Sequence, residues 1–200
     1  MEATAFVDRV FQHLPGTPVS RFTFSSWSHG GRPTAEGFGL LPVGPVDADG
    51  VIARVMDVDH YVGNVAHVDA CRSIADARFQ PPQAVRFYQL INLPVLGGLH
   101  NELVLTDGGT RDGWRFAYWG MLGPETQALS GRTAARSAYN VGAWLAKDGV
   151  VGYALSSAPS KDDVGRLKFA AMTRGADAAA PKVVKDNIEG MVRWARRAGA

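Results

Sequence analysis

Hydrophobic residues in the first third of the chain follow first a helical and then an alternating spacing. Phe6, Val7 and Val10 recur at helical spacing until Pro15-Gly16 ends the pattern, and polar and apolar residues then alternate as they do in a strand. After a stretch rich in glycine and proline, Asp47 provides a cap for a second helical run. The elements predicted here are a helix over residues 2–14, strands over 19–27 and 38–41, and a helix from 47 to about 62.

Strand-like runs fill the middle of the chain. Turn signals such as Asp107-Gly108-Gly109 and Asp148-Gly149 separate consecutive runs, so neighbouring strands are expected to be antiparallel. The runs span residues 67–75, 84–93, 100–106, 114–121, 138–146 and 150–156. Their succession predicts one antiparallel meander.

Helical spacing returns in the last quarter of the chain. The pair Asp162-Asp163 suits the start of a helix, Gly175 is expected to interrupt it, and Pro181 suits the first turn of a longer helix over residues 178–197. The apolar face of that long helix consists of Val184, Ile188, Met191 and Val192.

This order of elements predicts an α+β fold in a single domain over residues 1–200. With 46% hydrophobic and 20% charged residues, a chain of 200 residues can bury one sizeable core. The sheet must be covered on a face, and the long terminal helix is suited to cover it. A curved antiparallel β-sheet wrapped around a long C-terminal α-helix leaves space between the two, so an internal cavity is expected.

Five segments carry a resemblance to a known family. They are residues 55–62 (VMDVDHYV), 87–94 (FYQLINLP), 142–144 (GAW), 152–159 (GYALSSAP) and 187–194 (NIEGMVRW). Together they resemble the START-like superfamily, also called helix-grip, Bet v 1-like or SRPBCC, which includes lipid-transfer domains, the birch pollen allergen group and polyketide aromatase/cyclases. His100-Asn101 departs from the START lipid-transfer pattern, which has an Arg-Asp pair there. The resemblance implies the helix-grip fold and a hydrophobic ligand held in an internal cavity.

A ligand cavity needs apolar and aromatic side chains on the concave face of the sheet, with a few polar groups. For the strand over 114–121, the spacing does not decide between the face with Phe116 and Tyr118 and the face with Ala117 and Trp119. The candidate ligand-binding residues are Phe87, Gln89, Ile91, Phe116, Tyr118, Asn140, Trp144, Tyr153, Ile188 and Met191. Any of these residues can instead serve only to pack a core.

Few residues are suited to catalysis or metal binding. Asp57 and His60 lie at i, i+3 on one helical face and are candidates for an acid–base pair, because imidazole titrates near neutrality. A metal site needs three or four converging ligands, and only the distant His67 could join them, so no metal is predicted. Cys71 is the only cysteine and is expected to fill apolar space. Glycine motifs that bind nucleotides are absent, so no cofactor is predicted.

Charge and hydropathy bear on partners and location. The formal net charge is +2, which is too small to indicate a nucleic-acid partner. Arg193, Arg196 and Arg197 cluster near the C-terminus, where they are interpreted as a solvated helix face. The sequence has neither a secretory signal pattern nor an apolar run of the about 18 residues that span a bilayer. A cytoplasmic protein is therefore expected.

The leading functional hypothesis is the binding and transport of a lipid or other hydrophobic small molecule in the internal cavity. The alternative is an enzyme of the polyketide aromatase/cyclase type that acts on a hydrophobic guest in the same cavity, with Asp57, His60, Tyr118 or Asn140 as candidate acid, base or orienting groups. A third hypothesis is an interaction module with an exposed apolar patch. By resemblance, the loop over 93–99 should lie beside the terminal helix at the cavity mouth, where it could admit a guest or touch a membrane transiently.

Overall fold

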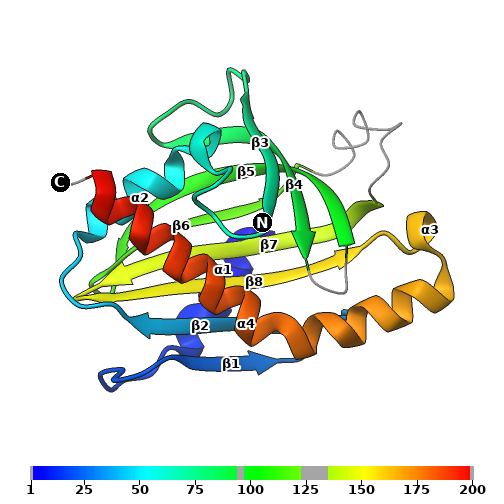
Figure 1. Ribbon diagram of the computed structural model, residues 1–200, viewed down its shortest axis with the longest axis horizontal. Helices are drawn as coiled ribbons and strands as arrows, with labels where there is room; N and C mark the ends of the chain where they lie inside the picture. The colour runs from blue at the N-terminus through cyan, green and yellow to red at the C-terminus, as the bar shows by residue number, and fades with distance from the viewer. Residues whose placement is uncertain (1, 94–96, 123–134, 199–200) are drawn as a thin grey trace.

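The computed structural model describes residues 2–93, 97–122 and 135–198. In this part of the chain eight strands form one curved sheet in the order β1-β2-β8-β7-β6-β5-β4-β3, and a long helix crosses its concave face (Figure 1). The strands are β1 (Thr23–Trp27), β2 (Glu36–Pro42), β3 (Val68–Ile74), β4 (Ala84–Leu93), β5 (Gly97–Arg111), β6 (Trp114–Met121), β7 (Ala135–Lys147) and β8 (Val150–Pro159). The helices are α1 (Glu2–His13), α2 (Ala48–Met56), the 3-10 helix η1 (Val58–His60), α3 (Lys161–Val164) and α4 (Arg166–Ala198). The predicted α+β fold is confirmed.

The strands from β3 to β8 form the predicted antiparallel meander. The bounds of β4 and β6 are those expected from the sequence. In contrast, β5 is longer than expected, because its first half pairs with β4 and its second half with β6. The hairpin of β1 and β2 adds to the free edge of β8, with Phe38 opposite Ala154. This addition places the N-terminal strands beside the end of the meander.

Helices cover both faces of the sheet, so the sheet separates two hydrophobic clusters. On the concave face α2 and α4 form the inner cluster, in which Trp144, Ile188 and Met191 are buried. On the convex face α1 forms the outer cluster, in which Phe6 of α1 and Phe38 of β2 are buried. A sheet buried on both faces does not show a clean alternation of polar and apolar residues.

The last helix differs from the sequence expectation. α4 runs without a break from Arg166 to Ala198, so the predicted interruption at Gly175 is wrong and Pro181 lies inside the helix rather than in its first turn. Gly costs about 1 kcal/mol and Pro about 3 kcal/mol in a helix interior. Burial of Val184 and Ile188 against the sheet outweighs these costs. α4 bends along its length (Figure 1), as expected where proline removes a backbone hydrogen bond.

α2 also ends earlier than predicted, at Met56 rather than near residue 62. Its start is the predicted one, because the Asp47 carboxylate accepts hydrogen bonds from the backbone N–H groups of Asp49 and Gly50. Asp57 leaves the helical conformation, with φ −88° and ψ 64°, and η1 follows. The chain then turns toward β3 and enters the space above the concave face.

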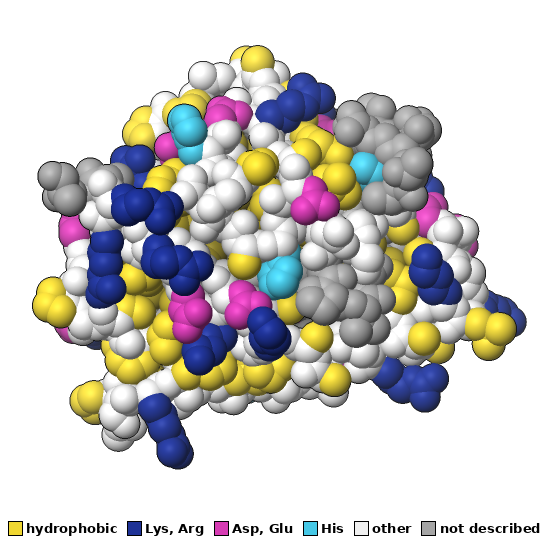
Figure 2. Space-filling view, viewed as in Figure 1, with side chains coloured by type: hydrophobic (Ala, Val, Ile, Leu, Met, Phe, Trp, Pro, Cys, Tyr) yellow, Lys and Arg dark blue, Asp and Glu magenta, His cyan; other side chains and the backbone are white. Residues whose placement is uncertain are grey.

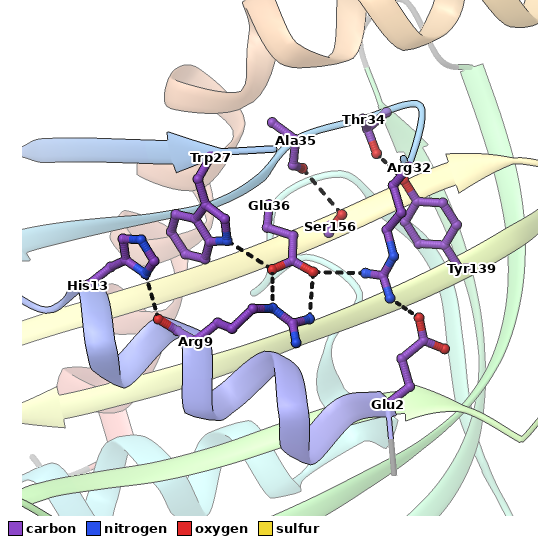
Figure 3. Close-up of polar contacts among 10 residues, drawn as sticks. All are labelled: Glu2, Arg9, His13, Trp27, Arg32, Thr34, Ala35, Glu36, Tyr139 and Ser156. Carbon is purple, nitrogen blue, oxygen red and sulfur yellow. Dashed lines mark hydrogen bonds and ion pairs between the residues drawn. The ribbon is translucent and has the colours of Figure 1, made fainter. Parts of the chain in front are cut away.

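A buried ion-pair cluster fixes α1 on the convex face (Figure 3). Glu36, at the start of β2, is fully buried and accepts hydrogen bonds from Nε and Nη2 of Arg9, both at 2.7 Å. Trp27 Nε1 at 3.0 Å and Arg32 Nη1 at 2.9 Å complete the partners of the carboxylate. Arg32 also pairs with Glu2 at the start of α1. The cluster ties α1 to the β1–β2 hairpin and occupies all four acceptor positions of Glu36.

Candidate ligand-binding cavity

A cavity of about 40 Å³ lies between the concave face of the sheet and α4. The predicted ligand-binding residues that line it are Phe87, Gln89, Ile91, Asn140, Trp144 and Tyr153. They lie on β4, β7 and β8, where alternate side chains point to one face. Ile188 and Met191 are buried in the same inner cluster but do not line the cavity.

The expectation that Phe116 and Tyr118 face the cavity is corrected. Phe116 lies on the convex side, where its ring meets Phe11 of α1 edge-on at a centroid distance of 5.3 Å. Tyr118 stacks on Phe116 at 6.2 Å. The opposite face of β6 carries Ala117 and Trp119, which belong to the inner cluster, and Trp119 lines the cavity. The spacing could not separate the two faces because both are apolar and both are covered by helices.

Aromatic rings form much of the cavity wall. The ring centroid of Tyr153 lies 5.5 Å from that of Trp119 and 4.5 Å from that of Trp144. Tyr61 and Phe87 add two further rings to the wall, with centroids 6.4 Å apart. These rings come from β4, β6, β7, β8 and the segment after η1, so distant parts of the chain build one aromatic surface.

A chain of buried hydrogen bonds crosses the same face of the sheet. Trp119 Nε1 donates to Asn140 Oδ1 at 2.8 Å, and Asn140 Nδ2 donates to Asn101 Oδ1 at 2.9 Å. Asn101 Nδ2 in turn donates to the carbonyl oxygen of Leu99 at 3.3 Å. Asn101 and Asn140 are 1% and 2% exposed, so these partners replace water for both amides. Sequence reasoning identified Asn140 but missed Trp119 and Asn101.

The described residues that line the cavity include no Asp, Glu, Lys or Arg. Burial raises the pKa of the Tyr153 hydroxyl and raises that of Tyr61 well above its ordinary value. Both phenols are therefore neutral at physiological pH. The Tyr61 hydroxyl donates to the carbonyl oxygen of Val55 in α2, which fixes the ring at the cavity wall. The wall thus offers apolar surface, amide and phenol groups, and the imidazole of His67.

His67 marks the boundary between the cavity and the surface. Its side chain lines the cavity, and its Nε2 lies 3.5 Å from Oδ2 of Asp186 on α4. Asp186 also accepts a hydrogen bond from Lys182 Nζ at 2.6 Å. The backbone of His67 has φ 63°, and its carbonyl oxygen accepts from the N–H of Asn92 at the end of β4. His67 therefore joins β3, β4 and α4 at one point.

Asp57 and His60 lie away from the cavity. His60 Nδ1 is 2.7 Å from Asp57 Oδ1, and the His60 side chain is 70% exposed. The hydrogen bond to Asp57 raises the pKa of His60. Asp57 also pairs with Arg54 at 3.7 Å. The two residues do form a pair, as their spacing suggested, but neither lines the cavity.

Cys71 packs against the inner cluster, as expected of a small apolar side chain. Burial raises the pKa of its thiol to about 12. The thiolate, which is the reactive form, is therefore scarce at neutral pH.

Charged residues of both signs cover the outer surface of α4. Figure 2 shows basic and acidic side chains interspersed over the C-terminal part of this helix. Lys185 pairs with Glu189 at 3.7 Å, while Arg193, Arg196 and Arg197 are exposed. None of the described helices is both long and apolar enough to cross a membrane. Residues 94–96 of the expected gate loop lie outside the described residues, and Leu99 of the same segment is buried in β5.

Solved structures with this architecture include two lipid-transfer proteins. A fragment of the STAR-related lipid transfer protein from Xanthomonas axonopodis matches 90% of this chain and 97% of its own, with a TM-score of 0.67 and 14% identity. Human StAR-related lipid transfer protein 5 matches 100% of this chain and 97% of its own, with a TM-score of 0.68 and 10% identity. The chain has the START-like helix-grip fold. The helix-grip arrangement predicted from the sequence is thereby confirmed.

A biosynthetic protein also has the START-like helix-grip fold. The di-domain ARO/CYC protein StfQ from the steffimycin biosynthetic pathway matches 82% of this chain, with a TM-score of 0.53 and 13% identity. The match spans 52% of StfQ, which is about half of that longer chain. No protein-family model and no curated protein sequence matches the chain.

Proposed function

We propose that this chain binds a hydrophobic small molecule in the cavity between the sheet and α4, and carries it. The observation that carries this proposal is the cavity wall, in which aromatic rings surround a few polar groups and no Asp, Glu, Lys or Arg is found among the described lining residues. Such a wall is typical of sites for hydrophobic small molecules. Two proteins of the same fold are lipid-transfer proteins, which supports a carrier function for this helix-grip domain.

A guest requires more room than the inner cavity alone provides. Its volume of about 40 Å³ is far below the roughly 300 Å³ at which small-molecule sites begin. Two further spaces of about 50 and 40 Å³ lie between α4 and strands β2 and β8. Leu155 borders all three spaces, and Val183 borders the first two. A shift of these two side chains would join the spaces, which together measure only about 130 Å³. We infer that α4 also moves away from the sheet when a guest binds and widens the joined space into one site.

The proposal is tested by filling this junction. Leu155→Trp places an indole where the three spaces meet, whereas Leu167→Trp adds the same side chain at a residue that is 91% exposed. Titration with the neutral dye Nile red should give one site per chain in the wild type and in Leu167→Trp, and at least tenfold weaker binding in Leu155→Trp. Circular dichroism checks that each variant is folded.

Leu155→Ala serves as the converse variant, because it enlarges the junction and should keep or strengthen dye binding. Equal binding by Leu155→Trp and the wild type would show that the dye sits elsewhere, and the proposal would then be wrong.

An enzyme that acts on the guest needs an acid or base beside it. Of the four candidates for the enzyme, Asp57 and His60 lie outside the cavity and Tyr118 packs against the outer cluster. Asn140 lines the cavity, but an amide can only orient a guest, and the imidazole of His67 faces Asp186. Binding, rather than chemical conversion as in the aromatase/cyclase alternative, is therefore the function that we propose.

A further inference from the structure

The direction of the buried hydrogen-bond chain is set by one side chain. An indole N–H can only donate, so the atom of Asn140 that faces Trp119 must be its carbonyl oxygen. The amide nitrogen of Asn140 then faces Asn101, and the nitrogen of Asn101 faces the carbonyl oxygen of Leu99. Trp119 thereby orients two amides in the interior of the protein. Neither amide can flip without leaving a buried donor against a donor.

This orientation leaves hydrogen-bond donors unused at the cavity. The amide nitrogen of Asn140 has two hydrogens, and among the described residues only Asn101 accepts one of them. Tyr153 lines the same cavity, and its hydroxyl has no hydrogen-bond partner within the described part of the chain. The side chain of Gln89, which lies opposite Asn101 on β4, is likewise without a hydrogen-bond partner among residues 2–93, 97–122 and 135–198. A bound molecule can use these groups.

The charge of the wall restricts the ligand further. A phosphate or carboxylate placed in this cavity would find no Lys or Arg among the described lining residues, and the imidazole of His67 already lies 3.5 Å from the carboxylate of Asp186. Burying an ion without a partner of opposite charge is strongly unfavourable. In contrast, the aromatic rings of Trp119, Trp144 and Tyr153 favour the flat face of another ring system.

We propose that the cavity takes an uncharged, planar aromatic molecule and holds a carbonyl oxygen of that molecule with the donors of Asn140 and Tyr153. This inference rests on the proposed binding function and narrows it to one class of ligand. Asn140 and Tyr153 both border the inner cavity and both contribute donors to its wall. The aromatic wall and the oriented donors would then act on different parts of the same molecule.

A matched series of three compounds tests the ligand class. 9-Fluorenone has a ketone, fluorene has the same rings without the oxygen, and 9-fluorenecarboxylate has an anionic group instead. Quenching of tryptophan fluorescence gives the affinity of each compound for the full chain. We expect fluorenone to bind at least tenfold more tightly than the other two. Equal binding of fluorene, or equal or tighter binding of the carboxylate, overturns the inference.

Tyr153→Phe tests the donor without removing a hydrogen bond within the described protein. It should weaken fluorenone binding about fivefold and leave fluorene binding unchanged. Tyr118→Phe is the matched control on the convex face and should change neither affinity. An unchanged fluorenone affinity in Tyr153→Phe contradicts the assigned donor. If Nile red binds in the cavity but fluorenone has no advantage over fluorene, only this inference fails. If no probe binds at all, the proposed function itself fails.

Discussion

The indole ring of Trp119 lies directly over Gly142, its partner on the neighbouring strand β7. A Cβ atom at position 142 would be only 2.0 Å from Cζ2 of Trp119 and 2.6 Å from the carbonyl oxygen of Ala154. The missing side chain therefore gives the indole the position from which it donates to Asn140. The cavity wall depends on this pairing of a large and a small residue.

Replacing Gly142 by Ala should displace Trp119 and lower stability. Overpacking a buried site typically costs about 1–3 kcal/mol. Urea unfolding should show a loss in this range for Gly142→Ala, together with weaker binding of Nile red. Gly16→Ala is the control, because nothing lies within 4 Å of a Cβ built at that position. If Gly142→Ala is as stable as the wild type, the indole of Trp119 can move to another position without loss of folding free energy.

Glu36→Gln should destabilise the protein by about 3 kcal/mol or more at pH 7, because it removes the buried charge that pairs with Arg9 and Arg32. Chemical unfolding of the two proteins measures this difference. Glu189→Gln, at an exposed pair with Lys185, should cost no more than about 1 kcal/mol. A loss at Glu36 as small as that at Glu189 would show that the cluster does not hold α1.

The contribution of Glu36 should also depend on pH. Burial alone would raise the pKa of this carboxyl, but the hydrogen bond and charge of Arg9 outweigh burial and lower the pKa below its ordinary value of 4.5. A lowered pKa means that the stabilisation is complete above that ordinary value and is lost as the pH falls through the folded-state pKa. The stability difference between the wild type and Glu36→Gln should therefore shrink in acid. A difference that grows between pH 7 and pH 3 would contradict the assigned sign.

Cys71 should react slowly with thiol reagents in the folded protein. A pKa of about 12 in place of 9 lowers the thiolate fraction at pH 8 by roughly a thousandfold. Reaction with Ellman's reagent should be slow in buffer and fast in urea. Equal rates in the two solutions would show that this thiol is accessible in the folded state.

The contact between His67 and Asp186 should affect how fast a guest moves in and out. Asp186→Asn weakens this contact, which joins α4 to the cavity boundary, and also the pair with Lys182 within α4. Partly exposed ion pairs contribute about 0.2–1 kcal/mol, so stopped-flow rates of Nile red uptake and release should both rise roughly 1.4- to fivefold. Glu189→Gln, one turn further along α4, should leave the rates unchanged. If both variants behave like the wild type, this contact does not control access.

Local patterns were sufficient to predict much of the sheet but not the composition of the cavity. The bounds of β6 follow from its alternation and from the flanking turns, which depend only on nearby residues. The inward face of β6 depends on which helix covers each side, so spacing alone could not choose between Phe116 and Trp119. Asn101 was missed for a similar reason. Its role depends on Asn140, which is 39 positions further along the chain.

The prediction for α4 was also wrong because it used only local residues. Gly175 and Pro181 are local signals of a break, and the prediction followed them. The helix continues because distant residues of the sheet bury its apolar side chains, such as Ile188. For Asp57 and His60 the local spacing predicted the pairing correctly. It could not predict that the pair lies outside the cavity, because the position of the cavity depends on distant residues.

The tryptophan side chains can show whether a hydrophobic guest binds on the concave side of the sheet. The chain has five tryptophans. Trp119 and Trp144 line the cavity, whereas Trp27 and Trp114 pack against the outer cluster under α1. Their indole N–H groups give separate signals in a two-dimensional ¹H–¹⁵N NMR spectrum, and single Trp→Phe variants assign them.

The most direct measurement is the change of these signals on titration with Nile red. We expect the signals of Trp119 and Trp144 to shift and saturate at one dye per chain, while those of Trp27 and Trp114 stay in place. Shifts confined to Trp27 and Trp114, or no saturable shift of any indole signal, would contradict this expectation.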